Sequence, residues 1–339
     1  MSNILTIGAG VMSSAISIPA SDNGHKIKIL GTDFDGEIIK HIKEFQSHPS
    51  FNNKFNDNIS ALFSQDLNQS IIDSSDLIII GVSSKGIDWF IETFKKFNTD
   101  KKNFLLITKG LYINKKKYID ILPNKIKEQI KGINIVAVAG PCKALELADK
   151  IPTHICFTSE NVNHSNKISL LFKNDYYFVS VSDDILGIEF CSAIKNVYAI
   201  AVGIAQTFYG EDNLKNPESA IFSQSLYEMS KLIYQFGGNL NSAYGLAGLG
   251  DLYVTSSNGR NKLLGQLLGK RIPYESIMNK ELKDSTVEGA VLLQNNYKIF
   301  TEYFDNNTLN KNDYPLLNSL INTICFDKPI EIPWKTFEN

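Results

Sequence analysis

A single lysine interrupts the most apolar stretch of the chain, which runs from Ile188 to Ala205. A helix that is apolar on every side is normally buried, and a buried ammonium is costly unless it is paired or has a function. Removing an ammonium from water also lowers its pKa, which would allow proton exchange near neutral pH. Lys195 is therefore the first candidate for a catalytic acid or base. The alternative is a structural lysine whose stem packs in the core while its head reaches water.

A glycine-rich stretch, Tyr244 to Leu252, carries only one charge, that of Asp251. A buried carboxylate needs a partner, and Lys195 is the natural one; otherwise Asp251 would cap the next helix. Thr255 follows, and then Arg260 and Asn261 at the start of a predicted helix. A guanidinium and an amide there would suit a phosphate, although the same residues are also typical of a plain exposed loop.

The turn Gly8 to Met12 follows one apolar strand pattern and opens a helix pattern. Gly8 would allow a tight turn and Gly10 a close backbone approach, so that a pyrophosphate could lie at the helix N-terminus. The third position of the usual glycine pattern is Ser13. Two acids, Asp33 and Asp35, follow the second strand pattern, where a carboxylate can bind a ribose 2′-hydroxyl and repel a 2′-phosphate. The sequence thus favours NAD, with NADP as the alternative.

Polar residues also follow two later strand patterns: Ser83 after the one ending at Ile80, and Lys109 after the one ending at Ile107. Ligands bind at the carboxyl ends of parallel strands, so we expect both residues to face the cofactor. Taken alone, Lys109 would be interpreted as a surface lysine.

The 339 residues carry a net charge of −2, which gives no reason to expect nucleic acid or an anionic membrane as a partner. The four widely spaced cysteines lack metal-ligand spacing, so we expect no metal site and buried thiols rather than disulfides, as in a reducing cytosol. Met1-Ser2-Asn3 has no basic signal-peptide start. The apolar run around Lys195 is interpreted as too short and too polar at its centre to span a bilayer.

Apolar strand patterns alternate with helix patterns up to residue 184, and only helix patterns follow. This predicts an α/β domain at 1–184, with a mostly parallel sheet covered on both faces, and an all-α domain at 185–339. The strands are expected at Ile4–Ile7, Ile27–Leu30, Leu77–Ile80, Phe104–Ile107, Ile133–Ala139, His154–Thr158 and Tyr176–Val181. Helices are expected at Trp89–Phe97, Tyr118–Ile130, Ile185–Phe208, Ile221–Phe236, Lys262–Leu268 and Thr286–Phe300.

Taken together, these segments resemble the bacterial-type NAD(P)-dependent glycerol-3-phosphate dehydrogenases. The resemblance follows the family's order from about residue 4 to 290, and the blocks around Lys195 and Asp251 are its most specific parts. The matching residues are Gly8-Ala9-Gly10, Thr108 to Leu111, Gly140-Pro141, Glu146 to Ala148, Pro152-Thr153, Glu189, Ala193 to Val197, Asn213, Gly245 to Leu252, Thr255, Arg260-Asn261 and Val287 to Gly289.

The resemblance implies a Rossmann-like cofactor domain, a helical substrate domain, and reversible reduction of dihydroxyacetone phosphate to glycerol 3-phosphate. It implies that Lys195 is the acid/base at the C2 oxygen, that Asp251 holds it, and that Lys109 binds substrate near the reacting carbon. The phosphate end would be held by Asn196, Thr255, Arg260 and Asn261. The cofactor would be held by Gly8, Gly10, Val11, Met12, Asp33, Ser83, Lys109, Arg260 and Glu288. Family members are commonly cytoplasmic homodimers that supply phospholipid synthesis.

Several residues depart from the family pattern. Ser13 replaces a glycine or alanine, Ser83 a proline, and Cys142 a serine, and we expect these three to alter packing only. Gln224-Ser225 replaces an Arg-Gly pair, and Asn216-Pro217-Glu218 resembles an insertion; because they border the expected phosphate site, we expect an effect on substrate affinity. Two other functions are considered: a related dehydrogenase acting on a hydroxy acid or ketopantoate-like compound, and a non-catalytic dinucleotide sensor. The sensor would leave the Lys195/Asp251 pairing without a purpose.

Overall fold

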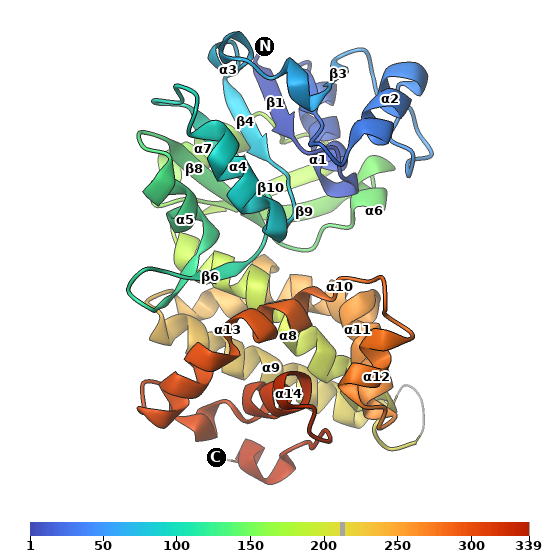
Figure 1. Ribbon diagram of the computed structural model, residues 1–339, viewed down its shortest axis with the longest axis vertical. Helices are drawn as coiled ribbons and strands as arrows, with labels where there is room; N and C mark the ends of the chain where they lie inside the picture. The colour runs from blue at the N-terminus through green and yellow to red at the C-terminus, as the bar shows by residue number, and fades with distance from the viewer. Residues whose placement is uncertain (211–213, 339) are drawn as a thin grey trace. The chain divides into compact units, whose positions relative to one another are not determined.

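The computed structural model describes residues 1–210 and 214–338. The chain divides into two compact units (Figure 1). The first comprises Met1–Lys109 and Leu122–Ile185, and the second comprises Gly110–Ile121 and the chain from Leu186 onward. This division differs from a single boundary after residue 184 because one short segment of the first half belongs to the second unit.

The first unit is built on an eight-stranded sheet with the order β10-β9-β8-β5-β4-β1-β2-β3. Neighbouring strands are parallel except β8 and β9, which are antiparallel. The mostly parallel sheet predicted from the sequence is confirmed, and one strand, β3, was not predicted. The strands are β1 (Asn3–Ile7), β2 (Lys26–Leu30), β3 (Ile59–Leu62), β4 (Leu77–Ile80), β5 (Asn103–Leu106), β8 (Asn134–Ala139), β9 (Thr153–Thr158) and β10 (Tyr177–Ser182).

Helices and two short 3₁₀ turns connect these strands. They are α1 (Val11–Asp22), α2 (Gly36–Phe45), η1 (Ser64–Asp66), α3 (Gln69–Asp73), η2 (Ser84–Gly86), α4 (Ile87–Phe94), α5 (Leu122–Gln129), α6 (Ala144–Ala148) and α7 (Val162–Ser169).

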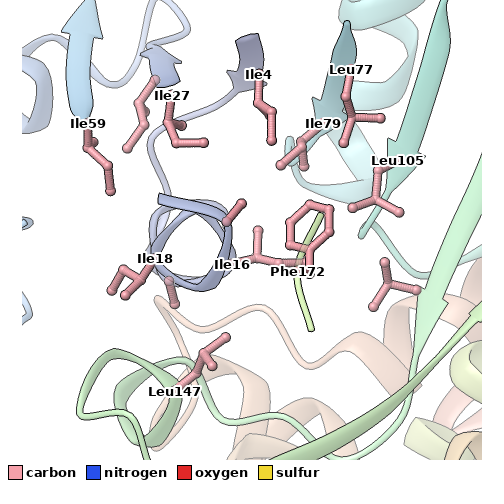
Figure 2. Close-up of a cluster of buried hydrophobic side chains, with 14 of the residues drawn as sticks. Ile4, Ile16, Ile18, Ile27, Ile59, Leu77, Ile79, Leu105, Leu147 and Phe172 are labelled. Atoms are coloured by element: carbon pink, nitrogen blue, oxygen red, sulfur yellow. The ribbon is translucent and has the colours of Figure 1, made fainter. Parts of the chain in front are cut away.

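The central strands bury apolar side chains on both faces, because successive side chains of a strand point to opposite sides. Figure 2 shows Ile4 of β1 and Leu77 of β4 directed toward α1, which contributes Ile16. Leu147 of α6 belongs to the same cluster. This face of the sheet is therefore covered by α1 and α6, and the packing holds α1 against β1 and β4.

The alternate residues of the same strands form a second core on the opposite face. Leu5 and Ile7 of β1 lie there with Phe90 and Phe94 of α4, whose stacked rings have centroids 4.4 Å apart. The sheet is thus covered on both faces, as the continuous apolar strands predict.

The predicted helix Tyr118–Ile130 is wrong in its first part. Ile119 and Ile121 are buried on either side of the half-buried Asp120, which is the two-residue period of a strand. This strand, β7 (Ile119–Ile121), pairs antiparallel with β6 (Leu111–Ile113), and the helix begins only at Leu122. The backbone N–H of Ile119 donates to the hydroxyl of Tyr303 at 3.3 Å, which ties the hairpin to the second unit.

In the second unit, the described residues form helices and this one hairpin. The helices are α8 (Ile185–Thr207), α9 (Lys215–Gln235), α10 (Asp251–Ser257), α11 (Arg260–Gly269), α12 (Tyr274–Asn279), α13 (Glu288–Asp305) and α14 (Pro315–Phe326), labelled in Figure 1. Shorter helical segments are η3 (Leu240–Tyr244), the π-helical η4 (Leu246–Gly250), η5 (Lys311–Asp313) and η6 (Trp334–Glu338). The predicted helices are present with shifted ends, while α10, α12 and α14 were not predicted.

Helix α8 is the apolar run that the sequence singled out. Its 23 residues are long and apolar enough to cross a membrane by length and composition, so the interpretation as too short was wrong. However, 94% of its most apolar window is buried inside the protein, as in the core helix of a soluble protein. The four cysteines are thiols and not disulfides, as expected, but only Cys156 and Cys191 are buried, while Cys142 and Cys325 are half-buried.

Candidate active site

Lys195 and Asp251 form a buried ion pair, which the sequence predicted. The Lys195 Nζ of α8 lies 2.9 Å from Oδ1 of Asp251, the first residue of α10. The two residues are only 5% and 3% exposed. The same Nζ donates to the hydroxyl of Thr255 at 2.5 Å. Thr255 follows Asp251 by four residues and therefore lies on the same face of α10. An ammonium held in this way can donate a proton and can stabilise a developing negative charge.

Asn196, which follows Lys195 in α8, forms a buried amide pair with Asn261. Asn261 Nδ2 donates to Asn196 Oδ1 at 3.0 Å, and Asn261 Oδ1 accepts the backbone N–H of Gly289 at 3.0 Å. A Cβ on Gly289 would lie 2.4 Å from the carbonyl oxygen of Asn196, so only glycine lets α13 start this close to α8. The amide pair thus joins α8, α11 and α13.

Two exposed charged residues begin the helices that meet at this amide pair. Arg260 is the first residue of α11 and precedes Asn261, while Glu288 is the first residue of α13 and precedes Gly289. The second unit therefore brings together, through α8, α10, α11 and α13, the residues assigned to acid/base chemistry and to the phosphate end. A guanidinium next to a fixed amide is suited to hold a phosphate group.

The glycine-rich turn of the first unit has the local geometry that a dinucleotide needs. Gly8 has φ +93°, and a Cβ there would lie 3.0 Å from the carbonyl oxygen of Gly81. Helix α1 begins at the exposed Val11, and no side chain caps it at Gly10. A Cβ on Gly10 would meet nothing closer than the Ser13 hydroxyl at 4.0 Å. Open space at the start of a twelve-residue helix fits an anionic pyrophosphate.

The departure at Ser13 is explained by its contact with the end of β4. Its hydroxyl donates to the carbonyl oxygen of Gly81 at 2.7 Å. Thr108 makes a similar bond, at 2.6 Å, to the carbonyl oxygen of Val82. These bonds fix the backbone that leads to the exposed Ser83 and to the half-buried Lys109.

The two acids after β2 have different environments. Asp33 is exposed, and its Oδ1 accepts the hydroxyl of Ser64 at 2.8 Å. Asp35 instead accepts from the turn itself, through the backbone N–H of Ala9 at 3.2 Å and of Thr32 at 2.8 Å. Only Asp33 therefore keeps the open position expected of a ribose ligand.

The unusual pair Gln224-Ser225 makes its bonds within α9. Gln224 Nε2 donates to Glu228 Oε1 at 3.1 Å, and the hydroxyl of Ser225 donates to the carbonyl oxygen of Ile221 at 2.7 Å. Glu218, which belongs to the segment that resembles an insertion, also lies in α9 and accepts a hydrogen bond from Gln206 of α8 at 2.7 Å. The family match at Asn213 lies outside the described residues. No sequence pattern singled out Glu228. The family resemblance linked Thr255 to the phosphate end, although its four-residue spacing from Asp251 could have indicated its contact with Lys195.

Comparison with known proteins shows the family of this chain. The model of the NAD-dependent glycerol-3-phosphate dehydrogenase N-terminus matches residues 3–165, and that of the C-terminus matches residues 184–332. An NADP(+)-dependent glycerol-3-phosphate dehydrogenase of Archaeoglobus fulgidus is 33% identical over 301 residues, covering 86% of this chain and 88% of that protein. The chain belongs to the NAD-dependent glycerol-3-phosphate dehydrogenase family.

Two further relatives extend the comparison over almost the whole chain. A glycerol-3-phosphate dehydrogenase [NAD(P)+] of Staphylococcus epidermidis (strain RP62A) is 29% identical over 337 residues, covering 97% of this chain and 96% of that protein. A crystal structure of glycerol-3-phosphate dehydrogenase from Coxiella burnetii has a TM-score of 0.80 at 22% identity, covering 99% and 98% of the two chains. At this identity the structural likeness shows the fold, which is the expected Rossmann-like domain plus helical domain.

Membership of this family establishes the reaction as the NAD(P)-dependent reduction of dihydroxyacetone phosphate to glycerol 3-phosphate. The cofactor is NAD, with NADP as an alternative, and the substrate is a small molecule. This decides against the hydroxy-acid dehydrogenase and the non-catalytic sensor considered from the sequence.

Proposed function

We propose that Lys195 is the acid/base that gives a proton to the C2 oxygen during reduction and removes it during oxidation. The observation that carries this proposal is the 2.9 Å contact between its buried Nζ and Asp251. Bound NADH supplies the hydride to C2, and the oxygen that gains charge needs a proton and a nearby cation. Asp251 holds the ammonium in place, and Lys109 adds a second positive charge near the reacting carbon.

Thr255 is proposed to orient the ammonium group of Lys195. Its hydroxyl accepts from Lys195 at 2.5 Å and lies 3.4 Å from Asp251 Oδ1. These two contacts support a role in orienting the ammonium more than the phosphate contact that the family resemblance implies. Two fixed acceptors restrict the orientation of the ammonium.

Asn196, Arg260 and Asn261 are proposed to hold the phosphate end. The bond from Asn261 to Asn196 Oδ1 orients the Asn196 amide, so that its Nδ2 group serves as the donor. Arg260 supplies the exposed guanidinium. Binding of the phosphate would then orient the carbonyl group at the other end of the substrate. Loss of these phosphate contacts should therefore lower turnover as well as affinity.

The cofactor is proposed to bind with its pyrophosphate at Gly8, Gly10, Val11 and Met12 and its ribose at Asp33. Ser83, Lys109, Arg260 and Glu288 complete this set by resemblance to the family. The open face of the turn at Gly10 and the exposed carboxylate of Asp33 support the first two assignments. Because a carboxylate repels a 2′-phosphate, we propose a preference for NAD over NADP.

A cytoplasmic homodimer that supplies glycerol 3-phosphate for phospholipid synthesis is proposed from the resemblance to the family. Light scattering of the purified protein tests the dimer: a mass of twice 37.9 kDa is expected.

The acid/base assignment is tested with Lys195→Met. We expect turnover with dihydroxyacetone phosphate and NADH to fall by about 10²–10⁴-fold, while NADH still binds. Lys298→Met, which removes an exposed lysine of α13, is the matched control and should retain the wild-type rate. Because Lys195→Met leaves Asp251 buried without its cation, the double variant with Asp251→Asn keeps the test valid if the single variant is unstable. A near wild-type rate in either variant would overturn the assignment.

The phosphate assignment is tested with Arg260→Ala, using dihydroxyacetone phosphate and phosphate-free dihydroxyacetone as substrates. Activity on the phosphorylated substrate should fall by a larger factor than activity on dihydroxyacetone, because a contact of Arg260 with the cofactor would affect both substrates alike. Unchanged kcat and KM for dihydroxyacetone phosphate would contradict the assignment. Parallel assays with NADH and NADPH test the proposed cofactor preference.

A further inference from the structure

One carboxylate oxygen of Asp35 joins the glycine-rich turn to the turn that follows β2. Oδ2 accepts the backbone N–H of Ala9 at 3.2 Å, the backbone N–H of Thr32 at 2.8 Å and the hydroxyl of Thr32 at 2.8 Å. Asp35 stands at the N-cap of α2, yet its side chain does not cap that helix. The carboxylate is therefore committed to the neighbouring turn and not to its own helix.

Hydrogen bonds hold the buried side of the glycine-rich turn. The N–H of Gly8 donates to the carbonyl oxygen of Leu30 at 2.8 Å, and the hydroxyl of Ser14 donates to the carbonyl oxygen of Ala9 at 3.4 Å. With Asp35 on the N–H of Ala9, both backbone groups of this buried residue have partners. The next residues, Gly10 and Val11, are partly or clearly exposed. Fixing the inner peptide therefore sets the direction in which the following amides point.

We propose that Asp35 is a positioning residue for the cofactor, which orients the glycine-rich turn through hydrogen bonds. The inference rests on the proposed binding of the dinucleotide at this turn and assigns to Asp35 a role distinct from that of Asp33. A preorganised turn binds the pyrophosphate more tightly because fewer backbone rotations are lost on binding. Since the pyrophosphate is common to both cofactors, Asp35 affects NADH and NADPH alike, whereas Asp33 discriminates between them.

Two variants separate the position of the oxygen from the charge. Asp35→Asn removes the charge but keeps an acceptor oxygen at the same distance from the backbone. Asp35→Glu keeps the charge but moves the oxygens by one methylene. The matched control is Glu37→Ala, an exposed acid of α2 whose contact is a surface pair with Lys40 at 2.6 Å.

The experiment measures the Kd of NADH and of NADPH by nicotinamide fluorescence, with kcat, the KM for dihydroxyacetone phosphate and the melting temperature for each variant. We expect Asp35→Glu to raise the Kd of both dinucleotides by about tenfold, since displacing the oxygens costs about as much as one hydrogen bond. Asp35→Asn keeps an acceptor in place and should raise each Kd by less than about threefold. The KM for dihydroxyacetone phosphate should stay within about twofold, as should both Kd values of the control. A merely structural role would lower the melting temperature without moving either Kd.

Wild-type affinity in Asp35→Glu overturns the inference, and so does an Asp35→Asn variant as weak as Asp35→Glu, since the charge would then be decisive. A loss confined to NADPH or to NADH also overturns it, because a turn that holds the shared pyrophosphate cannot distinguish them. If the wild-type protein binds neither dinucleotide, the proposed function itself fails. If it binds both and Gly10→Val does not weaken them, the dinucleotide lies elsewhere and the premise fails independently of Asp35.

Discussion

Glu228 of α9 is fully buried, and its partners are neutral donors. Its Oε1 accepts the backbone N–H of Leu316 at 2.8 Å and Nε2 of Gln224 at 3.1 Å. Its Oε2 accepts the backbone N–H of Leu317 at 3.0 Å and the hydroxyl of Tyr198 at 3.2 Å. Burial raises the pKa of this carboxyl from 4.5 to about 7, although all four bonds favour the ionised form. Glu228→Gln is therefore predicted to change how the stability of the protein depends on pH.

The sign and size of the effect follow from the raised pKa. Between about pH 4.5 and 7 the folded state holds a proton that the unfolded state has released, so this group's contribution to stability falls as the pH rises. Each unit of pKa is worth about 1.4 kcal/mol, which gives a total change of roughly 3 kcal/mol. The titratable groups facing Glu228 are Tyr198 and Tyr314, whose pKa values are also raised by burial, so both stay neutral in this range. Beyond Tyr314, Asp313 is paired with Lys231 at 2.5 Å.

The assay is urea unfolding of the wild-type protein and Glu228→Gln at several values between pH 5 and 8.5. The free energy of unfolding of the wild type, minus that of the variant, should decrease by roughly 3 kcal/mol across this range. Any hydrogen bond that glutamine fails to replace shifts this difference by a constant and leaves its pH dependence intact. Gln224→Arg places a cation beside the carboxylate and should flatten the wild-type profile. Parallel profiles for wild type and Glu228→Gln would refute the reasoning.

Three further predictions concern close contacts in the two units. Gly289→Ala should lower the melting temperature and raise the KM for dihydroxyacetone phosphate, because its Cβ would lie 2.4 Å from the carbonyl oxygen of Asn196. Gly81→Ala should destabilise the first unit by about 1–3 kcal/mol, since the new Cβ would lie 2.3 Å from the Ser13 hydroxyl; adding Ser13→Gly should recover most of the loss, as thermal unfolding of the three variants would show. Asp251→Asn should cost about 3–5 kcal/mol by leaving the Lys195 ammonium buried without its carboxylate, and a double-mutant cycle with Lys195→Met should show recovery. Additive losses in either pair would contradict these contacts.

The sequence predicted the long-range pairing of Lys195 and Asp251 because burial of a charge restricts its possible partners. Asp251 is the one charge of its glycine-rich stretch, and Lys195 is the one cation of an apolar stretch that also holds Glu189, so the cost of burying each charge favours their pairing. The bond between Asp35 and Ala9 had no such signal. Asp33 and Asp35 are chemically identical and two residues apart, and only the path of the turn decides which carboxylate faces inward.

The limits of the fold prediction have equally local causes. The strands buried on both faces were predicted because they are continuous apolar runs, whereas β3 has the weak pattern Ile-Ser-Ala-Leu at the sheet edge. The reversed direction of β9 relative to β8 depends on the connection between them and not on either strand's composition. Strand β7 was mistaken for the start of a helix, and β6 was not predicted, because three-residue strands are too short to establish a period.

Consecutive positions on α8 relate the two ends of the proposed substrate site. In a helix of 3.6 residues per turn, neighbouring side chains diverge by about 100°. Lys195 is therefore directed to α10 while Asn196 is directed to Asn261 of α11. Since both positions belong to one buried helix, the separation between the ammonium and the amide pair is set by rigid backbone. The connections between α9 and α13 can then differ in length without changing the distance between the proton donor and the proposed phosphate ligands.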